Sequence, residues 1–161
     1  MSRDKYKPHV LVLPEDDANR QLANGFLLDH SLMPRSIQVL DVAGGWLKLL
    51  ECFKADHVPE MERNPRRFMV LLIDFDKRQD RLVDAQTAIP SHLTDRVFVL
   101  GVWSEPEKLK PTLGPYETIG RAMAKDCREG TDAVWSHALL RHNAGEIDRL
   151  RERVRPILFE G

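Results

Sequence analysis

Residues 68–81, FMVLLIDFDKRQDR, decide the fold. Six apolar residues lead directly into Asp74, Phe75 and Asp76, and a burst of charged residues follows. A short continuous apolar run of this kind is typical of a strand that is buried on both faces, as in parallel sheets. Two acids one residue apart at its end either hold a cation or begin a loop and cap the next helix.

Strand and helix patterns alternate outward from this stretch. Three more apolar runs have the pattern of strands, at residues 9–13, 36–42 and 96–103, and helical patterns separate them. Strands separated by helices predict right-handed crossovers and a mainly parallel four-stranded sheet with helices on both faces. Residues 54–67 are charged and contain two prolines, which indicates a surface loop.

After Trp103 the pattern becomes helical. The segments 116–127, 131–142 and 143–159 each place apolar residues at helical spacing, and Pro156 is expected to kink or end the last helix. We therefore expect one α/β domain over residues 1–161, with a sheet core at 1–103 and a helical C-terminal part at 104–161. A chain of 161 residues is of the size of a single domain.

Composition limits the classes of function. The chain carries 24 basic and 25 acidic side chains, so it has no overall field that would attract a nucleic acid, and such a partner would need a local patch. No apolar run approaches the length of about 20 residues that a membrane-spanning helix needs, and the N-terminal residues lack a signal core. The two cysteines, Cys52 and Cys127, form no metal motif. We expect a cytoplasmic protein without membrane contact.

Acidic and hydroxyl residues follow three of the four predicted strands. Glu15, Asp16 and Asp17 follow the first, Asp74 and Asp76 the third, and Ser104 and Glu105 the fourth. The carboxyl ends of parallel strands meet at one edge, where the functional crevice of open α/β folds lies. Strand alternation would send both Asp74 and Asp76 into that crevice. Carboxylates crowded there suit Mg²⁺ or Mn²⁺, although Asp16 and Asp17 can equally be helix caps.

These residues resemble the Toprim domain of topoisomerases, bacterial primases and overcoming-lysogeny-defect nucleases. The family places a Glu at the end of its first strand and a D-x-D at the end of its third, and here VLVLPED supplies Glu15 and LLIDFD supplies Asp74 and Asp76. The resemblance implies that Glu15 takes part in acid–base chemistry and metal binding, and that Asp74 and Asp76 hold Mg²⁺. Glu105 would be a further ligand. Many members have Gly after the Glu, whereas Asp16 stands here.

VLVLPEDDANRQL also resembles the start of a response-regulator receiver. In that reading Asp16 and Asp17 would be the acidic pair, Asp74 the phosphoacceptor and Ser104 the hydroxyl after the fourth strand. A receiver also needs a Lys after a fifth parallel strand, and no apolar strand ending in Lys follows Trp103.

From the sequence we expect a Toprim-like, divalent-metal-dependent protein that processes phosphodiester bonds. Within that class we favour a nuclease or a DNA-processing or defence factor. The candidate partners are a nucleic acid and a second protein. The alternative is a non-catalytic binding or regulatory module that resembles a receiver.

Overall fold

One parallel sheet forms the centre of the molecule. The structure, a computed structural model, describes residues 7–159. Its strands are β1 (His9–Pro14), β2 (Ile37–Val39), β3 (Arg67–Asp74) and β4 (Val97–Val102), in the order β2-β1-β3-β4. All three pairings are parallel, which confirms the predicted fold class. The two strands that end in acids, β1 and β3, are direct neighbours.

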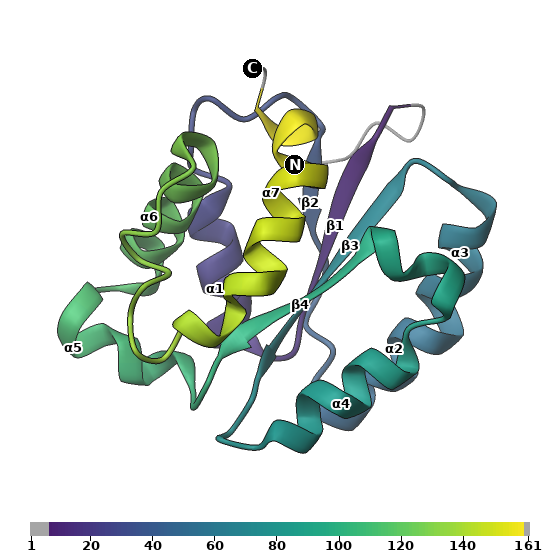
Figure 1. The fold of residues 1–161 in the computed structure, drawn as a ribbon, viewed down its shortest axis with the longest axis horizontal. Coiled ribbons are helices and arrows are strands. Elements are labelled where there is room, and N and C mark those ends of the chain that lie inside the picture. The colour runs from purple at the N-terminus through teal and green to yellow at the C-terminus, as the bar shows by residue number, and fades with distance from the viewer. Residues whose placement is uncertain (1–6, 160–161) are drawn as a thin grey trace.

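Helices cover both faces of this sheet (Figure 1). On one face lie α1 (Asp17–Phe26), α6 (Tyr116–Glu129) and α7 (Ala144–Leu158), and on the other lie α2 (Trp46–Cys52), the π-helix η1 (Phe53–His57), α3 (Val58–Arg63) and α4 (Gln79–Ala88). Successive residues of a strand point to opposite faces of the sheet, so each strand contributes to two hydrophobic cores, one on each face. Val10 and Val12 pack into the first core, under α1, α6 and α7, and Leu11 and Leu13 pack into the second, under α2, α3 and α4. Burial on both faces explains why the strands are continuously apolar.

Residues 54–67 are helical for most of their length, so the predicted surface loop was wrong. The chain continues from α2 through η1 into α3 without leaving the helical region. Pro59 lies in the first turn of α3 and has no N–H to donate to the preceding helical turn, which is the π-helix η1. Met61 is fully buried and anchors this otherwise charged segment to the second core.

Residues 131–142 do not form the predicted helix. They form a series of turns that ends in the 3₁₀-helix η4 (Arg141–Asn143). The buried carboxylate of Asp126 accepts hydrogen bonds from the backbone N–H groups of Ala133 and Val134 and from the Thr131 hydroxyl. A side chain that binds successive backbone donors stabilises turns in competition with a helix.

Apart from residues 131–140, the chain after β4 forms short and long helices, as predicted, and Phe159 makes an isolated bridge with Leu32. The short elements are η3 (Pro106–Leu109) and α5 (Lys110–Leu113), which lead into α6, and η2 (Ser91–Arg96) precedes β4. Helix α7 continues through Pro156 to Leu158. Within residues 7–159, none of the helices combines the length and the apolar content that crossing a bilayer requires.

Candidate metal centre

The ends of β1 and β3 bring two acids together across the strand boundary. Pro14 pairs with Leu72 in the parallel register, so the residues that follow each strand emerge side by side. The Glu15 N–H donates to the Leu72 carbonyl at 2.9 Å, and the Asp74 N–H donates to Glu15 Oε1 at 3.1 Å. The sheet ladder thus continues into a bond that fixes the Glu15 carboxylate against the end of β3.

Asp16 completes a cluster of three acids. Each of Glu15, Asp16 and Asp74 offers a carboxylate oxygen, and these oxygens all lie within 4.8 Å of one another. Asp16 is also the N-cap of α1, since its Oδ1 accepts from the Asn19 backbone N–H at 3.0 Å. Asp16 therefore caps α1, as the sequence indicated, and the same carboxylate is one of the three acids of the cluster. Three hard oxygens at this spacing match the ligand preference of Mg²⁺ and Mn²⁺.

Asn19 joins the cluster from the first turn of α1. Its side chain is fully buried, and Nδ2 donates to Asp16 Oδ1 at 2.9 Å and to Asp74 Oδ1 at 2.8 Å. Its Oδ1 has no hydrogen-bond partner within the described part of the chain. Sequence reasoning missed this residue, although its position three residues after the N-cap places it on the helix face that looks back at the cap.

Crowding and burial shift the proton affinities of these acids. Burial, reinforced by the charges on Asp16 and Glu15, raises the pKa of Asp74 to about 8 against the opposing hydrogen bond from Asn19. Burial likewise raises the pKa of Glu15, while the Asp74 N–H and the Arg81 charge act in the opposite direction. Such shifts are expected where carboxylates share a half-buried site without a cation.

Arg81, at the start of α4, supplies positive charge beside the cluster. Its Nη1 donates to the Asp74 carbonyl at 2.9 Å and lies 3.8 Å from Glu15 Oε1, and its Nη2 lies 3.9 Å from Asp76 Oδ2. The guanidinium centre is 5.4 Å from the centroid of the Trp46 ring, within the range of a cation–π contact. Nε is buried without an acceptor among residues 7–159. The sequence did not point to Arg81 either, because an arginine within a helix forms no motif that would place it beside the acids.

Asp76 does not lie within the three-acid cluster. Strand β3 ends at Asp74, and Asp76 and Lys77 adopt left-handed backbone conformations with φ of 53° and 58°. The Asp76 and Lys77 N–H groups donate to the Ser104 and Trp103 carbonyls, and the Asp76 side chain is 66% exposed. The alternation that would align the two aspartates therefore stops after Phe75, which packs into the second core as expected.

Glu105 and Asp17 also lie apart from the three-acid cluster. Glu105 is exposed, and its pKa is raised mainly by a hydrogen bond shared with Glu107. Asp17 pairs with Arg20 on the exposed side of α1. Ser104 lies at the end of β4, and its hydroxyl is buried with no partner in the described chain.

The site can hold one hard cation between Glu15, Asp16 and Asp74, with Asn19 behind them and Arg81 at the side. Comparisons with protein-family models, curated proteins and solved structures found no match for this chain.

Proposed function

We propose that the chain is a Toprim-like protein that uses Mg²⁺ or Mn²⁺ to act on phosphodiester bonds, most specifically as a nuclease. The observation that carries the proposal is the convergence of carboxylate oxygens from Glu15, Asp16 and Asp74 within 4.8 Å at the carboxyl edge of the sheet. This edge is where open α/β folds bind their ligands. A divalent cation there would relieve the repulsion that raises the pKa of Asp74.

The buried amide of Asn19 supports a cation at this place. In the present arrangement its NH₂ group faces the carboxylates, and its Oδ1 is left without a partner. Turning the carboxamide over would direct Oδ1 at the carboxylates, which a bound cation favours and three bare carboxylates do not. A neutral amide oxygen is a regular ligand of hard cations.

The chain's own residues would divide the chemistry between them. Glu15, Asp16 and Asp74 would hold the cation, which would polarise a phosphodiester and stabilise charge on the leaving oxygen. Glu15 is the candidate acid–base group where its carboxylate is not bound to the cation, because burial raises its pKa in the metal-free site. Lys77, three residues beyond β3, would offset phosphate charge at the rim, where Asp76 and Glu105 would be outer ligands.

The test combines metal binding with cleavage. We expect Mn²⁺ or Mg²⁺ to raise the melting temperature of the natural chain and to support cleavage of single- or double-stranded DNA or RNA. Asp74→Asn should lose both effects. Asp80→Asn is the matched control, because Asp80 is an exposed acid of α4 that pairs with Arg78, and it should retain both. A natural chain without metal-dependent stabilisation and without cleavage would overturn the proposal.

Ser104 favours a second candidate, a receiver-like phosphoacceptor. Its buried hydroxyl has no partner in residues 7–159 and follows β4, the strand next to β3, which ends in Asp74. Glu15 and Asp16, rather than the expected Asp16 and Asp17, would then form the acidic pair. The region described after β4 contains no fifth strand of the sheet to carry the receiver's Lys, which ranks this candidate second.

Acetyl phosphate separates the two candidates. Mg²⁺-dependent phosphorylation of the natural chain that is lost in Asp74→Asn and kept in Asp80→Asn, without nucleic-acid cleavage, would establish the receiver-like function. Cleavage without stable phosphorylation would establish the phosphodiester function. Intact-mass measurement detects the phosphoryl group directly.

A further inference from the structure

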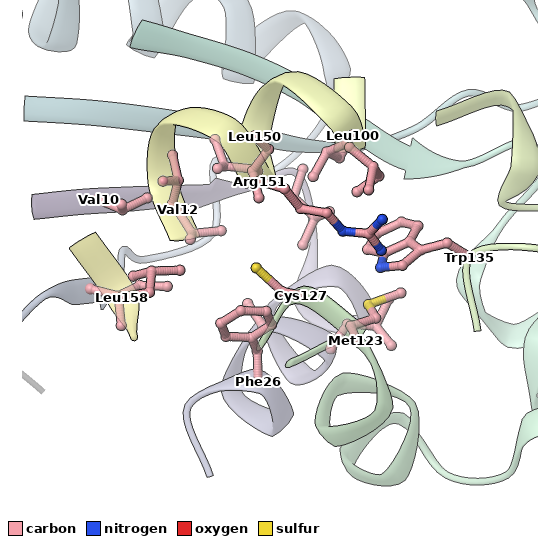
Figure 2. Close-up of a pocket in the computed structure, with 17 residues that line it drawn as sticks. Val10, Val12, Phe26, Leu100, Met123, Cys127, Trp135, Leu150, Arg151 and Leu158 are labelled. Carbon is pink, nitrogen blue, oxygen red and sulfur yellow. The ribbon is translucent and has the colours of Figure 1, made fainter. Parts of the chain in front are cut away.

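A second candidate site lies inside the first core, between the sheet and the helices α1, α6 and α7. It is a cavity of ≈ 80 Å³ (Figure 2). Its walls are apolar and include Val12, Leu100, Met123 and Trp135, and Arg151 is the one charged residue among those that line it within residues 7–159. A cavity lined in this way does not hold ordered water, because water needs two or more polar partners.

Arg151 brings one hydrogen-bond donor to the cavity. Figure 2 shows its side chain extending from α7 towards Trp135. Its Nη2 donates to the Thr131 carbonyl and forms an ion pair with Asp132 at 2.9 Å. Its Nε–H is buried and has no acceptor in the described residues. Because Asp132 already balances the charge of Arg151, the missing partner is a single neutral acceptor and not a second carboxylate.

The covering segment, residues 131–143, closes one side of the cavity without forming a regular helix before η4. Trp135, in this segment, lines the cavity, and Arg151 ties the segment to α7 through Thr131 and Asp132. Cys127 also lines the cavity, and burial raises the pKa of its thiol to about 11, so it stays uncharged. A segment of turns opens locally at lower free energy than a packed helix, which gives a small molecule a route of entry.

We propose that this cavity binds a small neutral aliphatic molecule that carries one acceptor oxygen, such as a ketone or an alcohol, with that oxygen accepting a hydrogen bond from Arg151 Nε. The volume sets the size of the ligand. A cavity of 150 Å³ accommodates benzene, which has six non-hydrogen atoms, so ≈ 80 Å³ corresponds to roughly three or four non-hydrogen atoms. The apolar walls supply the affinity, and the single donor selects for the oxygen.

The test uses acetone as the probe and the methyl resonances of the 161-residue chain as the readout. We expect saturable, millimolar shifts in the methyl signals of Val12, Leu100 and Met123. Arg151→Met keeps the aliphatic stem and removes the donor, and it should weaken binding at least fivefold. Arg153→Met is the matched control, because Arg153 is half-exposed and not part of the cavity wall, and it should bind as the natural chain does.

Two further measurements keep the outcomes distinct. Xenon should shift the same methyl signals in the natural chain and in Arg151→Met alike, because xenon needs the cavity and not the donor. Cys127→Leu should fill the cavity and abolish both responses while the protein stays folded. The proposal is overturned if acetone gives no saturable shift in the natural chain, or if Arg151→Met binds it as tightly as Arg153→Met does.

Discussion

Replacing Asp74 by asparagine should stabilise the metal-free protein at neutral and alkaline pH. The folded protein holds a proton on Asp74 up to a pKa of about 8, whereas the unfolded chain releases it near 3.8. Stability from this group is therefore complete below pH 3.8 and is lost progressively as the pH rises through the folded-state pKa. Asparagine has nearly the same shape and has no proton to lose, so the variant lacks this loss.

The change in the free energy of unfolding follows from the difference between the folded-state and unfolded-state pKa values of Asp74. The difference between 3.8 and about 8 corresponds to roughly 6 kcal/mol at about 1.4 kcal/mol per pH unit. Asp74 is only half-buried, so water screens part of this penalty, and Glu15 and Asp16 share it. Only the part of this interval above pH 5 falls within a comparison of pH 5 with pH 8.5, about 3 pH units or about 4 kcal/mol. Halving that figure for these two reasons gives about 2 kcal/mol as the expected gain of Asp74→Asn at pH 8.5 relative to pH 5.

Urea unfolding in EDTA at pH values from 5 to 8.5, followed by tryptophan fluorescence, measures this difference. The natural chain should lose stability with rising pH, and Asp74→Asn should lose about 2 kcal/mol less. Asp80→Asn should follow the natural chain. Saturating Mg²⁺ should flatten the natural curve, because a bound cation favours the ionised carboxylate. A natural curve that is already flat in EDTA, or an Asp74→Asn curve that falls in parallel with it, would refute the electrostatic reasoning.

Four other substitutions test local charge balance and packing. Arg81→Met should lower the stability of the metal-free protein by about 1–2 kcal/mol at pH 8 in the same urea assay, because the Asp74 carbonyl and the acids lose a charged donor. Gly101→Ala should abolish soluble expression, since its Cβ would lie 1.8 Å from the Ile73 carbonyl oxygen, whereas Gly145→Ala has no atom within 4 Å and should raise the melting temperature. Phe75→Ala should cost about 3–5 kcal/mol by chemical denaturation, because the ring is buried against Trp103 and His142.

The sheet could be predicted from the sequence because each strand is buried on both faces. A run such as residues 68–73 has no polar side that a helix surface would need, and the acids that follow it mark its end. The order of the strands places the ends of β1 and β3 together, which explains why Glu15 and Asp74 meet as the strand pattern suggested.

The remaining features depend on contacts between distant residues. Met61 holds a charged segment in a helix, and Asp126 holds an apolar segment in turns, and neither contact has a local signature. The position of Asp76 depends on bonds to the chain after β4, which draw its backbone into the left-handed region. Arg81 and Asn19 reach the acids from two different helices on opposite faces of the sheet. Contacts of this kind, between residues far apart in the sequence, cannot be predicted from local motifs.

The three acids are held in place by the fold itself. Glu15 is fixed by the Asp74 N–H, Asp16 by its capping bond to α1, and Asp74 by the amide of Asn19. The first two bonds satisfy backbone N–H groups and would form even without a metal, so Glu15 and Asp16 are arranged before a cation arrives. Binding of the proposed cation would then require a change chiefly at Asn19, whose amide would turn over. Asp76, at the rim, has an exposed side chain and lacks such a bond, so it would serve the proposed function only through outer contacts.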